Sequence, residues 1–148
     1  MNLLFDTNVL IHLAKDHSLK FLQLINPDNH KIFISVVTVG ELKSIALQNN
    51  WGPRKLAVIE ILLEEMLIVE INEGLIDSYA QIDAYSQHRN SSFPDYPFKT
   101  ARNMGKNDLW IAATAALLGL KLITTDGDFD HLHEAFFEVQ KFKPSDLQ

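Results

Sequence analysis

Short apolar runs alternate along the chain with longer segments in which apolar residues recur every three or four positions. The runs are rich in Ile, Val, Leu and Phe, which is typical of buried strands, and lie at residues 2–5, 31–36, 67–71, 121–125 and 136–142. The helical period is predicted at residues 38–49, 54–66 and 107–118. Strands separated by helices favour a mostly parallel sheet covered on both faces. The pattern therefore predicts an α/β fold with a central five-stranded sheet, forming one domain over residues 1–148.

Residues 89–106 follow neither period and predict a long loop. This segment contains two prolines and two serines, and it has a single acid, Asp95. Its basic residues are Arg89, Lys99, Arg102 and Lys106. They form a local basic patch on an acidic protein, and we consider Arg102 and Lys106 candidates for contacts to phosphates. An ordinary solvated loop explains the same charges equally well.

Composition narrows the chemistry that the domain can perform. The chain has no cysteine, which excludes disulfides and thiolate zinc sites and fits a reducing compartment. A formal charge of −6 argues against binding of nucleic acid by bulk electrostatics, although acids that carry Mg²⁺ would present a different charge to a phosphate. The chain begins without a signal-peptide pattern, and no apolar run approaches the roughly 20 residues of a membrane span. We expect a cytoplasmic protein with no membrane contact.

Four acids stand at positions where a purely structural explanation is available for each. Asp6 follows the first strand and would cap the next helix. Glu41 lies three residues after Thr38, which is the spacing of a capping box. Asp108 lies in the first turn of a predicted helix, where the helix dipole favours a negative charge, and Asp126 follows a strand in a turn sequence. Taken singly, none of the four requires a function.

Taken together, the four acids predict a metal site. Asp6, Glu41 and Asp126 lie just beyond strand ends, where parallel sheets place their ligand sites, and Asp108 lies at the start of a helix, which should be on the same side. Like charges about 4 Å apart repel by roughly 4 kcal/mol per pair at an effective dielectric of about 20, so a cation is expected among them. Carboxylates suit Mg²⁺ or Mn²⁺, which activate water for phosphodiester hydrolysis. Asp128 would share or replace the role of Asp126.

Four sequence blocks, each with one of these acids, also resemble a known family. The blocks are LLFDTNVLI, SVVTVGEL, KNDLWIAATA and LITTDGDFDHL. In this order and spacing they resemble the blocks of PIN-domain ribonucleases, particularly VapC-like toxins, over nearly the whole chain. The resemblance implies a PIN fold and an endoribonuclease dependent on Mg²⁺ or Mn²⁺. It maps Asp6, Glu41, Asp108 and Asp126 onto the family's acidic positions.

The resemblance also implies partners and leaves alternatives open. It implies an RNA substrate, a cognate antitoxin protein and a homodimer. Candidates for contacts to substrate, or for hydrogen bonds that orient the carboxylates, are Thr7, Asn8, Thr38 and Thr125. The alternatives are an RNA-processing nuclease outside a toxin system and a catalytically silent binding module. A phosphatase of the haloacid dehalogenase type is remote, because Asn8 stands where that chemistry needs a second aspartate.

Several other conspicuous residues have structural explanations. His131 and His133 alternate near the end of the chain, which is typical of surface residues, and a ligand role is the less favoured hypothesis. The aromatic residues of the predicted loop are expected to pack the loop onto the domain, although they are also candidates for stacking on bases, and they are Phe93, Tyr96 and Phe98. Expected core or dimer contacts in the helix at 107–118 are Trp110, Leu117 and Leu118.

Overall fold

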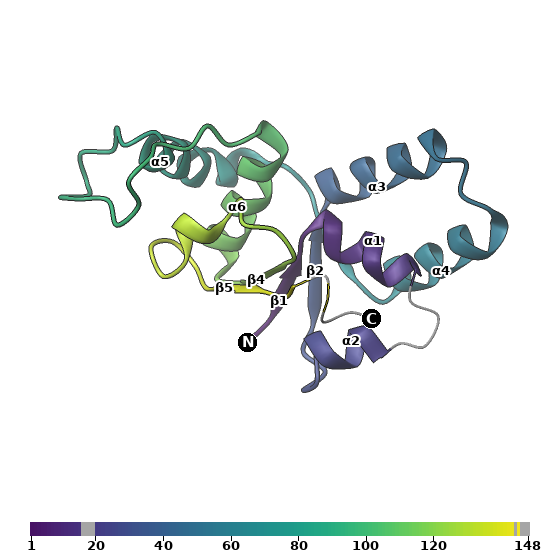
Figure 1. Ribbon diagram of the computed structural model, residues 1–148. Helices are drawn as coiled ribbons and strands as arrows, with labels where there is room; N and C mark the ends of the chain where they lie inside the picture. Colours follow the sequence, from purple (N-terminus) through teal and green to yellow (C-terminus); the bar gives the residue numbers. More distant parts are fainter. Residues whose placement is uncertain (16–19, 144, 146–148) are drawn as a thin grey trace.

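A parallel sheet divides the molecule into two layers of helices (Figure 1). The computed structural model describes residues 1–15, 20–143 and 145. Within these residues, five strands form one sheet in the order β3-β2-β1-β4-β5, and every pair of neighbours is parallel. The strands are β1 (Leu3–Phe5), β2 (Ile32–Ser35), β3 (Leu67–Val69), β4 (Lys121–Thr124) and β5 (Val139–Lys141). The predicted fold class and all five predicted strands are therefore confirmed, with each strand shorter than its apolar run.

One face of the sheet is covered by four helices near the N-terminus. They are α1 (Thr7–Lys15), α2 (Lys20–Ile25), α3 (Val36–Gln48) and α4 (Pro53–Glu64). Because side chains alternate along a strand, Leu3 and Phe5 of β1 pack on this side, whereas Leu4 between them packs on the other. The helices predicted at 38–49 and 54–66 are α3 and α4, each displaced by one or two residues.

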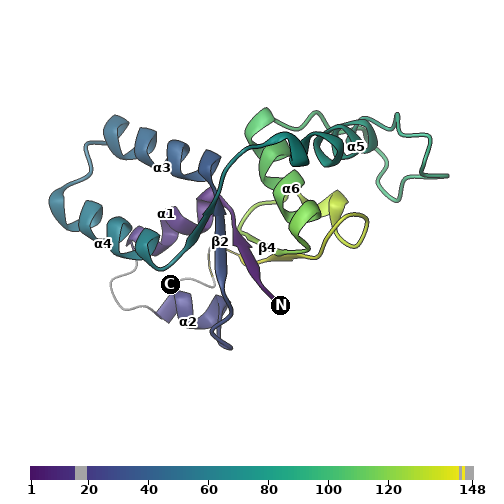
Figure 2. The same ribbon diagram turned by 180° about the vertical axis from the view of Figure 1, so that it is seen from behind.

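The other face is covered by α5 (Ile76–Ser86), α6 (Lys106–Leu118) and two short 3₁₀ helices, η1 (Glu73–Leu75) and η2 (Asp130–Leu132). Figure 2 shows the chain leaving α4, passing along the edge of the sheet through β3 and rising to α5 on this second face. Helix α6 is the helix predicted at 107–118, whereas α5 has no counterpart among the predicted helices. No helix in the described part of the chain is long and apolar enough to cross a membrane.

The predicted loop is present between the last two helices. Residues 87–105, which we call the long loop, connect α5 to α6 without a helix or a strand of their own. Figure 1 shows this segment extending beyond the second layer of helices. Since a loop of this length carries few ladder hydrogen bonds, its position depends on what its side chains contact.

Candidate active site

Asp6 lies at the end of the central strand and is the most buried acid of the domain's described residues. Its side chain and backbone leave only 3% of the residue exposed. One carboxylate oxygen accepts a hydrogen bond of 2.8 Å from the backbone N–H of Thr7, and the other accepts one of 2.9 Å from the hydroxyl of Thr124. Burial raises the pKa of Asp6 to about 7, and the nearby carboxylates of Asp126 and Asp108 add to the rise. The predicted role of Asp6 as a cap of α1 does not account for the burial of this carboxylate and its bond to Thr124.

Asp126 stands next to Asp6 because β1 and β4 are adjacent strands. The backbone N–H of Asp6 bonds the carbonyl of Ile123 at 3.0 Å, which aligns the two strand ends. The side-chain amide of Asn8 donates to Asp126 at 2.8 Å, and the backbone N–H of Asp128 donates to the other carboxylate oxygen at 2.9 Å. Asn8 thus orients an acid, which is one of the two roles predicted for it.

Glu41 reaches the same region from α3. The hydroxyl of Thr7 donates to Glu41 at 2.9 Å and lies 3.2 Å from the hydroxyl of Thr38. The predicted capping box is wrong, because α3 begins at Val36 and its N-cap is Ser35, whose hydroxyl accepts from the backbone N–H of Val37. Thr38 lies inside the helix and is fully buried. Glu41 is consequently held by α1 and not by its own helix end.

Asp108 lies in the first turn of α6, as predicted, and faces the other acids. Burial raises its pKa to about 6, and three neighbouring carboxylates contribute to the rise, namely Asp128, Asp126 and Glu41. Two acids with raised pKa values and several acidic neighbours at one edge of a sheet are typical of functional sites. The fold therefore brings together all five acids that the sequence singled out.

The chemistry of these donors fits a divalent cation bound through few direct contacts. In the described residues, no group of three acidic or histidine side chains is arranged to hold a metal ion as it stands. Mg²⁺ is commonly bound by one or two carboxylates together with several waters, so a closed cage of protein ligands is not required. Carboxylates whose pKa is raised by burial and by one another's charge would be stabilised in their ionised form by such a cation.

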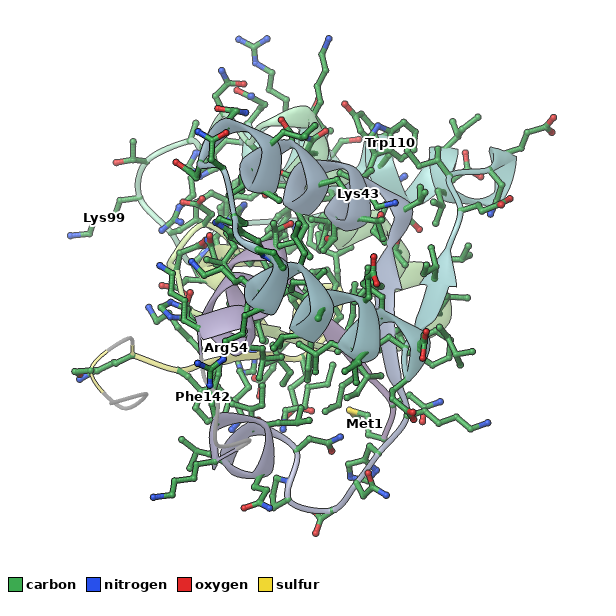
Figure 3. The ribbon with its side chains drawn as sticks, turned by 90° about the vertical axis from the view of Figure 1, so that its right-hand side faces the viewer. Met1, Lys43, Arg54, Lys99, Trp110 and Phe142 are labelled. Carbon is green, nitrogen blue, oxygen red and sulfur yellow. The ribbon has the colours of Figure 1, made fainter. Side chains whose placement is uncertain are left out.

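The remaining predicted contacts to substrate are distributed around these acids. Thr125 is partly buried at the end of β4, and Lys106 is exposed at the first residue of α6. Lys99, which is not one of these candidates, is exposed and points outward from the long loop (Figure 3). Arg102 is different, because its guanidinium donates to the carbonyl of Gly127 at 2.9 Å. Arg102 thus contacts the protein itself, beside the acids.

The prediction that His131 is a surface residue is wrong. His131 is 7% exposed, and its Nε2 lies 2.8 Å from the hydroxyl of Ser86, which is itself fully buried. Burial lowers the pKa of His131 to about 4. His133, in contrast, is exposed, as predicted.

Aromatic side chains attach the long loop to the domain. The rings of Phe93, Tyr96 and Phe98 pack around Tyr85 of α5, with centroids 4.5, 5.4 and 5.3 Å away. The expected packing role of these residues is therefore confirmed. In α6, Trp110 is partly buried and contacts Tyr79. Leu117 and Leu118, predicted as core or dimer contacts, are 47% and 45% exposed and are therefore not part of the core.

Two residues that matter to the site were not singled out in the sequence. Thr124 is fully buried and bonds Asp6, and its oxygen also accepts from the backbone N–H of Asp126 at 3.3 Å. The sequence signal for it was its place two residues before Asp126, but the alternation of β4 was needed to distinguish Thr124 from Thr125. Ser86 carried no signal, because its partner His131 lies 45 residues away.

Comparison with known proteins supports the fold. The PIN domain family matches residues 3–135 of the chain. Ribonuclease VapC2 of Haemophilus influenzae is 28% identical over 123 residues, covering 83% of this chain and 85% of that protein. Among solved structures, VapBC2 from Rickettsia felis, bound to a DNA fragment from its promoter, superposes with a TM-score of 0.76 at 17% identity, covering 95% of this chain and 98% of that one. VapBC-1 from nontypeable Haemophilus influenzae has a TM-score of 0.72 at 24% identity and the same coverage. The family match spans nine tenths of the sequence, and the chain belongs to the PIN domain family.

Proposed function

We propose that this protein is a metal-dependent endoribonuclease and the toxin of a toxin-antitoxin pair. The observation that carries the proposal is the buried carboxylate of Asp6, which faces Asp126 and Asp108 at the carboxyl ends of β1 and β4. Support comes from the curated relative, which is named a ribonuclease and matches most of this chain.

The residues divide into groups that would hold the cation and groups that orient them. Asp6, Asp108, Asp126 and Asp128 would hold Mg²⁺ or Mn²⁺, and Glu41 would complete the acidic site. The cation would supply an activated water and neutralise charge on the leaving oxygen. Thr124 and the Thr7 N–H fix the direction of Asp6, and Asn8 fixes Asp126. Because the pKa of Asp6 is raised to about 7, we predict that Asp6 loses a proton when a cation binds near neutral pH.

RNA would approach from the side where exposed polar side chains lie beside the acids. Lys106 begins the helix that carries Asp108, and Thr125 lies between Thr124 and Asp126. We propose that these two residues contact the substrate, whereas the packed aromatic residues of the long loop are unsuited to stacking on bases.

A partner protein is part of the same proposal. The similar solved structures are described as VapBC complexes and as a toxin-antitoxin complex from Klebsiella pneumoniae. By analogy we propose that this chain binds a cognate antitoxin, forms a homodimer and acts in the cytoplasm. Light scattering of the purified chain, alone and with the product of a short neighbouring reading frame, tests both assemblies.

The proposed activity is tested by cleavage of a mixed RNA pool with Mg²⁺, with Mn²⁺ and with EDTA. We expect metal-dependent products that Asp6→Asn reduces by at least about 100-fold. The matched control is Asp77→Asn, which removes an exposed acid from the first turn of α5 and should cleave like the wild type. Cleavage that persists in EDTA and in Asp6→Asn contradicts the proposal.

Two alternative functions give different outcomes in the same experiment. A folded protein that neither cleaves RNA nor binds Mg²⁺ at millimolar concentration is a silent binding module. A protein that cleaves RNA but neither arrests the growth of host cells nor has a neighbouring antitoxin gene is an RNA-processing nuclease.

A further inference from the structure

The turn that carries two of the acids is held from outside by the long loop. Residues Asp126–Asp130, which we call the acid turn, follow β4 and lead into η2. Arg102 of the long loop donates from its guanidinium to the carbonyl of Gly127, midway between Asp126 and Asp128, at 2.9 Å. A hydrogen bond from a charged donor is among the stronger ones available to a protein. Arg102 thus holds the backbone of the acid turn, whereas Asn8 and Lys141 hold the side chains of Asp126 and Asp130.

Arg102 is itself fixed at its backbone. Its N–H donates to the carbonyl of Ser86, the last residue of α5, at 2.7 Å. The same Ser86 contacts His131 through its hydroxyl at 2.8 Å, just beyond the acid turn. His131 is buried against the ring of Phe98, whose centroid lies 5.0 Å from that of the imidazole. The end of α5 is thus tied to the acid turn by two routes, through Arg102 and through His131.

These ties address a specific physical problem. Asp126 and Asp128 are close enough to Asp108 to raise its pKa, so all three carboxylates repel one another when they are ionised. A short turn whose charges repel is expected to open unless a contact opposes the opening. The backbone N–H of Asp128 binds Asp126 within the turn, and Arg102 holds the carbonyl between them.

We propose that Arg102 is a positioning residue for the metal site: through Gly127 it holds Asp126 and Asp128 facing Asp108. This inference rests on the proposed function and gives Arg102 a role different from the contact to phosphate that the basic character of its loop suggests. It also accounts for an arginine at this position, since lysine lacks the planar fork that directs a hydrogen bond toward a fixed carbonyl.

The first measurement uses protein without RNA. Binding of Mn²⁺ is followed by electron paramagnetic resonance for the wild type, Arg102→Gln, Arg102→Lys and the control Lys99→Gln. Lys99→Gln removes the same charge from an exposed position of the same loop. We expect Arg102→Gln to weaken Mn²⁺ binding about tenfold, Arg102→Lys to weaken it less, and Lys99→Gln to leave it unchanged.

The second measurement separates a positioning role from a contact to substrate. Cleavage rates are recorded over a range of Mg²⁺ and RNA concentrations. A positioning residue predicts that Arg102→Gln needs more Mg²⁺ and regains activity when Mg²⁺ is high, with the KM for RNA unchanged. An unchanged affinity for Mn²⁺ with a raised KM for RNA means that Arg102 binds phosphate, and this result overturns the inference.

The third measurement does not depend on any metal. Amide hydrogen exchange at Asp128 in EDTA reports whether the acid turn stays closed, because this N–H is bonded to Asp126. We expect faster exchange at Asp128 in Arg102→Gln than in Lys99→Gln, with equal exchange in the strands as evidence of intact folding. If the wild type binds no Mn²⁺, the proposed function fails, whereas the exchange rate still decides whether Arg102 holds the turn. Unchanged exchange at Asp128 contradicts the inference.

Discussion

The two faces of the sheet are built from different kinds of side chain. Beneath α1–α4 the core is mainly aliphatic, with Leu10, Leu13 and Leu42 fully or almost fully buried, although it also contains the buried rings of Phe5 and Phe21. Beneath α5 and α6 the core combines alanines of α6 with a group of rings centred on Tyr85. The first face is covered mainly by helices, with Trp51 and Phe142 packed against it from outside them, whereas the second incorporates a long loop as part of its packing.

This difference explains where the acids come from and what holds them. Glu41 comes from a helix of the aliphatic face, and Asp108 comes from a helix of the aromatic face. Asp6 and Asp126 follow the strands between the two faces. The candidate active site is consequently a junction, and it requires both faces to be in place. Only the aromatic face includes the long loop, whose Arg102 contacts the acid turn.

The largest expected effect comes from breaking the aromatic face at its centre. Tyr85 is 2% exposed, and Tyr85→Ala would remove the ring against which the loop aromatics pack. We expect a loss of about 3–5 kcal/mol in the free energy of unfolding and rapid proteolysis within residues 87–105. Chemical denaturation and limited proteolysis measure the two effects.

Leu42→Ala provides the matched change in the aliphatic face. Leu42 is 1% exposed in α3, and we expect a loss of about 2–5 kcal/mol without early cleavage of the long loop. If the long loop is cleaved equally fast in both variants at the same residual stability, the two faces unfold as one unit. The aromatic face would then have no separate role in holding the loop.

A smaller effect is expected from Thr124→Val, which acts on the junction itself. The hydroxyl of Thr124 lowers the pKa of Asp6 by donating to its carboxylate, so removing the hydroxyl should raise that pKa above about 7. We expect the acidic limb of the cleavage profile to move upward by about one pH unit, with about tenfold less activity below that limb.

Thr114→Val is the control for this change. Thr114 is also buried, but its hydroxyl bonds the carbonyl of Trp110 within α6, so its loss should not move the profile. A profile that is identical in Thr124→Val and the wild type would show that Asp6 does not control the rate through its protonation.

Much of the junction was predictable because its elements are local. An acid directly after a strand can be identified from the apolar run before it, and parallel strands place such acids at one edge. This reasoning located Asp6 and Asp126 and the helix that begins beside Asp108. The capping box at Thr38 failed because the preceding Ser35 took the cap, which lengthened α3 at its start.

The aromatic face was harder to predict because its determinants are distant in sequence. Helix α5 reads IDSYAQIDAYS, in which polar residues interrupt the apolar period and Ile76 is exposed. Its stability depends on packing against α6 and the loop, and no local pattern reports such packing. The burial of His131 depends in the same way on Ser86 and Phe98.

The last expected effect is a pair of opposite slopes of stability against pH in EDTA. The native pKa of Asp6 is raised from 3.8 to about 7, so its contribution to stability is present at low pH and is lost as the pH rises through about 7. Asp108 acts in the same direction. The native pKa of His131 is lowered from 6.5 to about 4, so its contribution is present above 6.5 and is lost as the pH falls through about 4. As the pH rises, the acids of the junction therefore lower the stability of the protein, whereas His131 of the aromatic face raises it.

Two variants separate these slopes. Near pH 7, the free energy of unfolding of Asp6→Asn should exceed that of the wild type by about 2 kcal/mol, as measured by denaturation. The variant should also gain stability as the pH rises from 4 to 7, because Asp6 no longer opposes the contribution of His131. His131→Gln, which keeps a side-chain amide toward Ser86, should lose stability over the same range. Asp77→Asn should follow the wild type. If Asp6→Asn is instead strongly destabilised at neutral pH, the carboxylate of Asp6 contributes net stability through Thr7 and Thr124, and the repulsion among the acids is too weak to require a cation.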